Sequence, residues 1–177
     1  MQWIFLCYYI KVVLVSDMKI QEFADFVVEY SQDNFSFVNE PELVAVYGMI
    51  EEWGEFVGEY KRLVRDGFSE KSIKRFDENS GVELSDVIAY WIIRVFNVNF
   101  GVVVLDDVSY DKYYISLAEA IPDVTKRLTQ YVLFDLDEKE LLNRLVSLGG
   151  FIEGGIESAF DKCVDKLKKR GSVGDKN

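Results

Sequence analysis

A chain of 177 residues that is 49% hydrophobic and 15% aromatic can bury one sizeable core, which excludes an intrinsically disordered protein. Its formal net charge of −11 argues against duplex DNA or an anionic membrane as a partner, because no basic surface could dominate the electrostatic field. With no histidine and only two cysteines, Cys7 and Cys163, the chain lacks the commonest general base and any cysteine-rich zinc site, and it fits a reducing cytoplasm.

The first seventeen residues form an apolar run that is broken by Lys11. The run is too short for a membrane span, and it has neither a basic leader nor a small-residue cleavage site. Because Met18 follows directly and opens an amphipathic segment, we expect residues 1–17 to be an extension outside the working protein. Two other interpretations stay open, a signal-like segment and an added strand or helix. The domain is expected over residues 18–170, with a flexible tail over 171–177.

The long stretches of helical periodicity, with only two prolines, predict an all-α helical bundle. We expect Asn39 to cap a helix that has Pro41 in its first turn. The expected helices cover residues 18–30, 41–65, 82–98, 113–132, 138–151 and 153–170, with a polar loop over 65–79 and a strand or lid over 101–111. The segment 137–156 faintly resembles residues 82–101, as a degenerate repeat would.

The expected helix 41–65 carries two apolar faces. One is a seam in steps of three and four from Leu43 to Val64, and the other contains two acids, Glu52 and Glu59, with Glu55 at its edge. We therefore expect burial on both faces. Glu59 is expected either to join a metal site or to pair with a basic neighbour, Lys61 or Arg62.

The expected helix 82–98 is apolar almost all round, which is typical of a central helix. Glu83, Asp86 and Tyr90 lie along one narrow stripe of it. Glu83 also fits a capping box with Ser80, so a structural role is open for this residue. Asp86 is harder to explain structurally, because aspartate is a poor helix former and its neighbours are apolar.

Two i, i+3 pairs, Glu52 with Glu55 and Glu83 with Asp86, place four carboxylates in apolar surroundings. Such acids repel one another unless a cation lies between them. Oxygen ligands favour Mg²⁺ or Mn²⁺, which points to phosphate chemistry. In a chain without histidine, catalysis must rest on carboxylates and a metal ion.

The last expected helix places Lys166 and Arg170 at i, i+4, where both could reach a polyphosphate. The plainer interpretation is a solvated, basic helix end. The sequence contains no glycine-rich phosphate loop.

The order of these motifs resembles the MazG-like, all-α nucleoside triphosphate pyrophosphohydrolases. An E-x-x-E helix at Glu52 and Glu55 is followed by Lys61-Arg62 and by an E-x-x-D helix at Glu83 and Asp86. Residues 163–170 are similar to that family's closing N-x-x-K-L-x-x-R segment, and residues 18–30 to its short first helix. The chain departs from the pattern in having Cys163 where the family has asparagine, and in a longer region over 101–155.

The resemblance implies a Mg²⁺-dependent enzyme that hydrolyses a nucleoside or deoxynucleoside triphosphate to the monophosphate and pyrophosphate. The implied metal ligands are Glu52, Glu55, Glu83 and Asp86. The implied substrate-binding residues are Lys166 and Arg170, assisted by Lys61. From its place one turn beyond Asp86, we also expect Tyr90 either to hydrogen-bond a carboxylate or to line the base pocket. We expect Glu55 to be the general base.

The resemblance also implies a homodimer or higher homo-oligomer, unless the second half of the chain supplies the missing helices itself. Two alternatives for the function stay open. One is a pyrophosphohydrolase of the same fold for dUTP or phosphoribosyl-ATP, and the other is a catalytically inactive helical interaction protein.

Overall fold

The computed structural model describes residues 20–34, 38–99, 103, 105, 108, 113–134 and 138–174. All regular secondary structure in these residues is helical, so the predicted all-α bundle is confirmed. The elements are a first helix over residues 20–34, α2 (Pro41–Arg65), α3 (Glu70–Val98), α4 (Leu117–Phe134), α5 (Glu138–Ser147), the 3₁₀ helix η1 (Leu148–Phe151) and α6 (Gly155–Gly174). Residues 1–17, predicted to be an extension, lie outside the described part of the chain.

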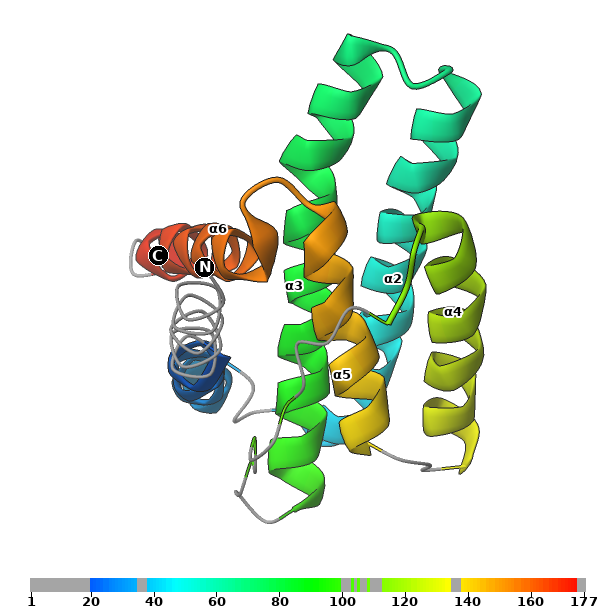
Figure 1. Ribbon diagram of the computed structural model, residues 1–177. Coiled ribbons are helices and arrows are strands. Elements are labelled where there is room, and N and C mark those ends of the chain that lie inside the picture. The colour runs from blue at the N-terminus through cyan, green and yellow to red at the C-terminus, as the bar shows by residue number, and fades with distance from the viewer. Residues whose placement is uncertain are drawn as a thin grey trace, which may run out of the picture.

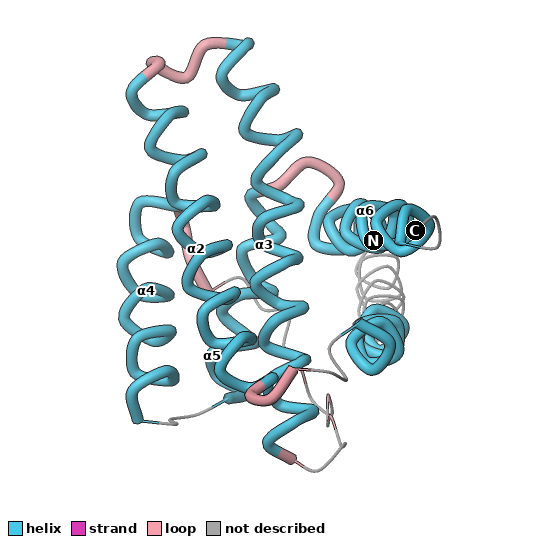
Figure 2. The backbone as a smooth tube through the Cα atoms, turned by 180° about the vertical axis from the view of Figure 1, so that it is seen from behind, coloured by secondary structure: helices cyan, strands magenta, loops and turns pink. Residues whose placement is uncertain are grey.

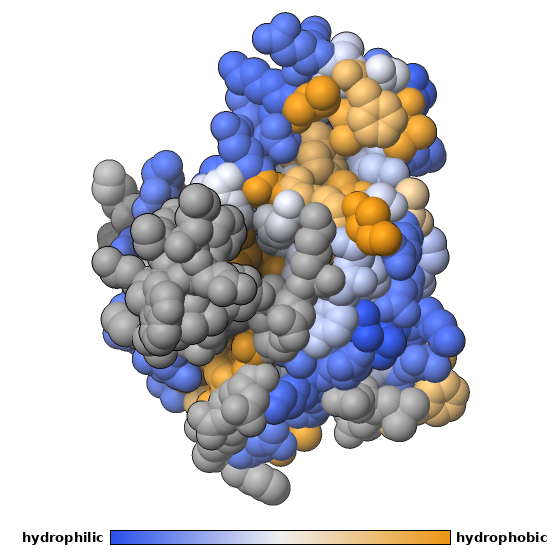
Figure 3. Space-filling model, viewed as in Figure 1, coloured by the Kyte–Doolittle hydropathy of each residue, from blue (hydrophilic) through white to orange (hydrophobic). Residues whose placement is uncertain are grey.

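The long hairpin of α2 and α3 forms the centre of the molecule. Helices α4 and α5 lie on one side of it, and α6 lies on the other side with the first helix (Figures 1 and 2). The hairpin projects beyond the other helices, and its projecting end carries a hydrophobic area in Figure 3. Exposed Val64, Phe68 and Ile73 belong to this end. Within the described residues, no helix combines the length and apolar character that crossing a membrane requires.

The start of α3 corrects the predicted loop over residues 65–79. The helix begins at Glu70, where the Ser69 hydroxyl caps it by accepting a hydrogen bond from the Ser72 backbone N–H at 3.2 Å. Ser80 therefore lies fully buried inside a 29-residue helix, and the predicted capping box with Glu83 is wrong. The Ser80-Gly81 pair looks like a helix break in the sequence, but packing from α6 keeps the helix continuous.

The burial of α2 bears out the prediction of two buried faces only in part. The face that contains Met49, Phe56 and Glu59 is buried against the core. The predicted seam is divided: Trp53 is buried and Val46, Val57 and Tyr60 are half-buried against the core, whereas Leu43, Ile50 and Val64 are exposed. The indole N–H of Trp53 donates a hydrogen bond to the Thr125 hydroxyl of α4 at 2.9 Å. Helix α2 therefore buries one broad face against α3 and α4. Its N-cap residue is Glu40 without a side-chain cap, so the predicted Asn39 cap is also wrong.

The second half of the chain departs from prediction mainly at helix ends. Helix α4 begins at Leu117 rather than at residue 113, and α6 continues to Gly174, through most of the predicted flexible tail. The segment thought to repeat α3 divides into α5, η1 and the start of α6, so the two segments fold differently. Most of the predicted strand or lid over 101–111 lies outside the described residues; residues 103, 105 and 108 have no regular secondary structure.

Candidate functional site

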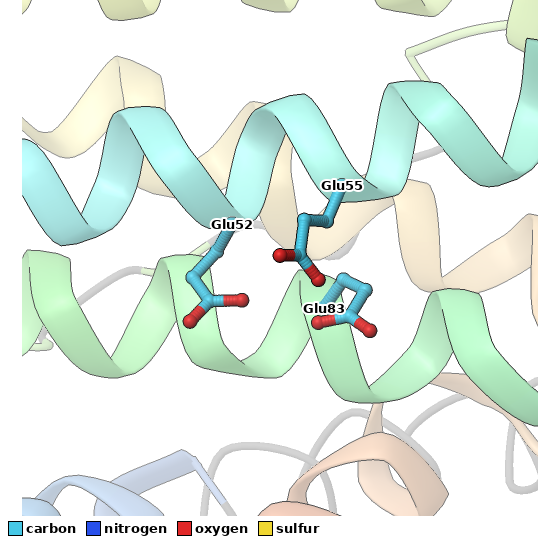
Figure 4. Close-up of side chains that lie close together, drawn as sticks. All are labelled: Glu52, Glu55 and Glu83. Atoms are coloured by element: carbon cyan, nitrogen blue, oxygen red, sulfur yellow. The ribbon is translucent and has the colours of Figure 1, made fainter.

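Three carboxylates from the two central helices meet at one point. Glu52 and Glu55 of α2 and Glu83 of α3 each offer one oxygen, and these oxygens all lie within 4.8 Å of one another. Figure 4 shows the three side chains pointing into the space between α2 and α3. Glu52 and Glu83 are half-buried, while Glu55 is exposed to solvent. The i, i+3 spacing on α2 and the antiparallel packing of α3 thus create a group of oxygens that is open on one side.

The electrostatics of this group favour a bound cation. Burial, the negative charge of Asp86 and a hydrogen bond with Glu83 raise the pKa of Glu52 to about 8. Burial also raises the pKa of Glu83, although its hydrogen bond with Glu52 works in the opposite direction. Without a cation, a proton shared by the two carboxyl groups relieves their repulsion at neutral pH. A hard dication fits the same place, because the donors are all carboxylate oxygens and the exposed side leaves room for water.

Asp86 lies beside the three carboxylates but has partners of its own. The buried thiol of Cys163 donates a hydrogen bond to Asp86 Oδ1 at 3.1 Å, and the ammonium of Lys166 donates one to Oδ2. Burial alone would lower the pKa of Lys166, but the hydrogen bond and the charge of Asp86 outweigh it and raise that pKa. Of the four predicted metal ligands, the structure thus groups three and places Asp86 against α6.

Small residues allow α6 to approach α3 closely enough for these contacts. A Cβ atom on Gly81 would lie 3.5 Å from the Ala159 Cβ and 3.2 Å from Ile152 Cγ2. One turn further along each helix, buried Ser85 and Cys163 continue the contact. The thiol at position 163, which departs from the family pattern, therefore both fits the narrow interface and supplies a donor to Asp86.

A pocket of about 90 Å³ opens beside the acidic residues. It is bounded by the first helix, α2, α3 and α6, and its lining residues are Val27, Tyr30, Glu52, Asp86, Ala89, Tyr90, Ile93, Leu167 and Arg170. Two of the predicted substrate-binding residues, Tyr90 and Arg170, thus line one pocket with Glu52. Tyr30 also lines the pocket, and its place on the first helix was the only indication of that role in the sequence.

The ring of Tyr90 packs directly against Gly48 of α2. A Cβ atom at residue 48 would lie 2.5 to 2.6 Å from three atoms of the Tyr90 ring, so the ring lies directly against the α2 backbone. Gly48 is a residue of the candidate site that the sequence analysis did not single out. A glycine in the middle of an expected helix was the available signal, because such a position often marks a close approach.

Two other predicted residues lie apart from the acidic group. Lys61 is exposed on α2, and none of the ion pairs found among the described residues includes it. Glu59 is buried and pairs with Arg62 and with Arg75 Nε, the latter at 3.4 Å. The pairing of Glu59 with Arg62 was one of the two predicted outcomes, and it gives Glu59 a structural role.

The fold and the site define an all-α helical bundle in which a three-carboxylate group borders a small pocket. Comparisons with models of protein families, with curated proteins and with solved structures find no match to this chain. A proposal for the function therefore rests on the chemistry of these residues and on the order of their motifs.

Proposed function

We propose that the protein hydrolyses a nucleoside or deoxynucleoside triphosphate to the monophosphate and pyrophosphate, with Mg²⁺ or Mn²⁺ as cofactor. The observation that carries the proposal is the group formed by Glu52, Glu55 and Glu83 at the edge of a pocket that contains two tyrosines and an arginine. The resemblance of the motif order to MazG-like pyrophosphohydrolases supports the same activity.

The oxygen group is the place where a metal ion fits. Glu52, Glu55 and Glu83 would hold the ion, with Asp86 adjacent to them and already oriented by Cys163 and by Lys166. When bound, the ion would supply a Lewis acid that neutralises phosphate charge and makes water more acidic. The ion would also take the place of the proton that Glu52 holds at neutral pH.

Two regions along α3 suit the two ends of a nucleotide, the acidic residues at one and the tyrosines at the other. Tyr90 lies seven residues beyond Glu83, which is about 10 Å along a helix that rises 1.5 Å per residue. The acidic end then suits the phosphates through the metal, and the end at Tyr30, Tyr90 and Ile93 suits the nucleoside, whose base can stack on an aromatic ring. Arg170 lines the same pocket, where its guanidinium could bind an oxygen of the nucleotide.

Glu55 is the carboxylate best suited to accept a proton from the attacking water. It is the exposed member of the three, so water can reach it directly. Glu52 and Glu83 are less suited because they are half-buried, so water reaches them less readily. Lys166 lies one helical turn from Arg170 and next to Asp86, where its charge lowers the pKa of Glu52 and balances added negative charge.

The test is a pyrophosphate-release assay over the common ribonucleotides and deoxyribonucleotides, including dUTP and phosphoribosyl-ATP, with and without Mg²⁺. We expect Mg²⁺-dependent release from at least one of them and loss of release in Glu52→Gln. Absence of release from every nucleotide, together with a melting temperature that Mg²⁺ does not raise, would contradict the proposal and favour the alternative of an inactive helical interaction protein.

A further inference from the structure

The turn that joins α2 to α3 presents large apolar side chains to solvent. Phe68 lies in the turn and is 54% exposed, while Val64 of α2 and Ile73 of α3 are 48% and 44% exposed. Val64 is one residue from the end of α2, and Ile73 is three residues from the start of α3, so both lie within about one helical turn of Phe68. This end of the hairpin stands clear of the other helices and carries an apolar area (Figures 1 and 3). We call residues 61–75 the hairpin tip.

Phe68 has a backbone conformation that bulky residues seldom adopt. Its φ is 54°, in the left-handed region, and the preceding Gly67 has a φ of 72°. The turn is closed by the backbone alone, because the N–H groups of Gly67 and Phe68 donate to the carbonyls of Val64 and Leu63 at 3.2 Å. Glycine at residue 68 would form the same hydrogen bonds without strain. A strained aromatic residue that is half exposed therefore points to a use outside the packing of the chain itself.

The hairpin tip is basic, although the whole chain has a net charge of −11. Residues 61–75 contain six basic and two acidic residues, a net charge of +4. All six basic side chains are exposed, namely those of Lys61, Arg62, Arg65, Lys71, Lys74 and Arg75. The acids that border the tip lie behind it. Buried Glu59 pairs with Arg62 and Arg75, and Asp77 and Glu78 lie further along α3.

The acidic residues of the candidate site are too distant to cancel this positive charge. Glu55 precedes Arg65 by ten residues, which is about 15 Å along a helix. At physiological ionic strength, charges in solvent are screened over about 8 Å. The prediction against an anionic membrane, which the charge of the whole chain supports, therefore does not apply to the field at the hairpin tip.

We propose that the hairpin tip binds the surface of a membrane that contains anionic lipids. Phe68, Val64 and Ile73 would enter the boundary between headgroups and acyl chains. Lys61 and Arg75 lie about 6 to 8 Å behind the helix ends, a depth that places them among the lipid phosphates. A nucleic acid or a polyacidic protein segment would satisfy these charges but not the three apolar side chains in front of them. The hairpin tip contains no residue of the three-carboxylate group or its pocket, so this proposal is independent of the proposed function.

The first experiment measures sedimentation of the full chain with lipid vesicles. We expect binding to vesicles of phosphatidylcholine with phosphatidylserine, weakened by salt, and no binding to phosphatidylcholine alone. Phe68→Gly should raise the lipid concentration for half-maximal binding about 10-fold, because an apolar anchor is lost. Its melting temperature should not fall, because glycine adopts the same φ without strain. Phe68→Trp should retain binding. Lys71→Gln should weaken binding about 5-fold. The control is Tyr47→Ala, which removes a more exposed aromatic ring near the other end of α2 and should bind as the wild type does.

The second experiment tests which part of the molecule touches the lipid. In a Cys7→Ser background, an environment-sensitive fluorophore on Phe68→Cys should shift to the blue with anionic vesicles, whereas the same label on Tyr47→Cys should not. Absence of vesicle binding, or equal binding by Phe68→Gly and the wild type, would overturn the proposal. Binding that removal of residues 1–17 abolishes and Phe68→Gly leaves unchanged would also overturn it. Binding to soluble polyglutamate without binding to vesicles would overturn it as well, and would assign the tip to an acidic macromolecule.

Discussion

The ammonium of Lys166 donates a hydrogen bond to the carboxylate of Asp86 across 80 residues of sequence. The contact joins the last helix to the acidic helix at the point where Cys163 contacts the same carboxylate. One basic residue thus has two consequences, because it fixes α6 against α3 and partly balances the negative charge around Glu52.

The first prediction concerns pH and the stability of the metal-free protein. The pKa of Glu52 is about 8 in the folded chain against 4.5 for the ordinary group, so the folded state binds more protons than the unfolded state between these values. Stability should therefore fall as pH rises from about 5 to above 8. In Glu52→Gln this fall should be smaller, which thermal melts across this pH range will measure. Exposed Glu51 provides the control, and Glu51→Gln should keep the wild-type slope.

The second prediction distinguishes the effect of the three-carboxylate group on Mg²⁺ binding from the effect of Asp86. Glu52→Gln should abolish the Mg²⁺-induced rise in melting temperature and the pyrophosphate release, because it removes an oxygen from the metal-binding group. Asp86→Asn acts through neighbouring residues, so we expect a loss of about 10- to 100-fold in Mg²⁺ affinity, as for residues that orient ligands. Calorimetric titration with Mg²⁺ measures both. Equal Mg²⁺ affinities in the two variants and the wild type would contradict the assignment of a metal site to this group.

The third prediction distinguishes the two cations of α6. Lys166→Ala leaves the buried Asp86 carboxylate without its charged partner and should lower the free energy of unfolding by about 2 kcal/mol. Arg170→Ala removes an exposed residue of the pocket and should leave stability nearly unchanged while it weakens nucleotide binding. Urea unfolding and substrate titration check the two effects. If Arg170 binds an oxygen pair of the nucleotide, Arg170→Lys should not restore binding.

The fourth prediction concerns Gly48 and the shape of the pocket. Alanine is normally about 1 kcal/mol better than glycine inside a helix, but here its Cβ atom would overlap the Tyr90 ring at 2.5 Å. Gly48→Ala should therefore displace Tyr90 and raise the Michaelis constant for the nucleotide more than it changes the Mg²⁺ affinity. Gly150→Ala, in open space, is the control and should alter neither. A crystal structure of Gly48→Ala with Tyr90 unmoved would contradict the explanation.

The sequence was sufficient for the all-α class and for placing Glu52 beside Glu55 on one helix, because both depend on short-range spacing. The position of Glu83 beside them depends on the packing of α3 against α2, and only the order of the motifs indicated it. The sequence was insufficient where tertiary packing overrides local preference. Ser80-Gly81 resembles a helix break in the sequence, and only the packing of α6 shows otherwise, so the predicted start of α3 is about twelve residues too late.

The pairing of Asp86 could not be predicted for a related reason. Nothing local to Asp86 indicates that a thiol and an ammonium 77 and 80 residues later will contact it. The burial of α2 was partly misjudged because two of its faces are equally apolar in sequence. Only the positions of α3 and α4 decide which face is covered.

The buried thiol of Cys163 can report on the contact between α6 and α3. Burial, and after it the charge of Asp86, raises the pKa of this thiol. Solvent reagents therefore reach the thiol poorly, and little of it is thiolate, while α6 is packed against α3. In a Cys7→Ser background, the rate at which a thiol reagent modifies the chain measures how often α6 separates from α3. A ligand that stabilises the closed arrangement slows that reaction in proportion to the opening that it suppresses.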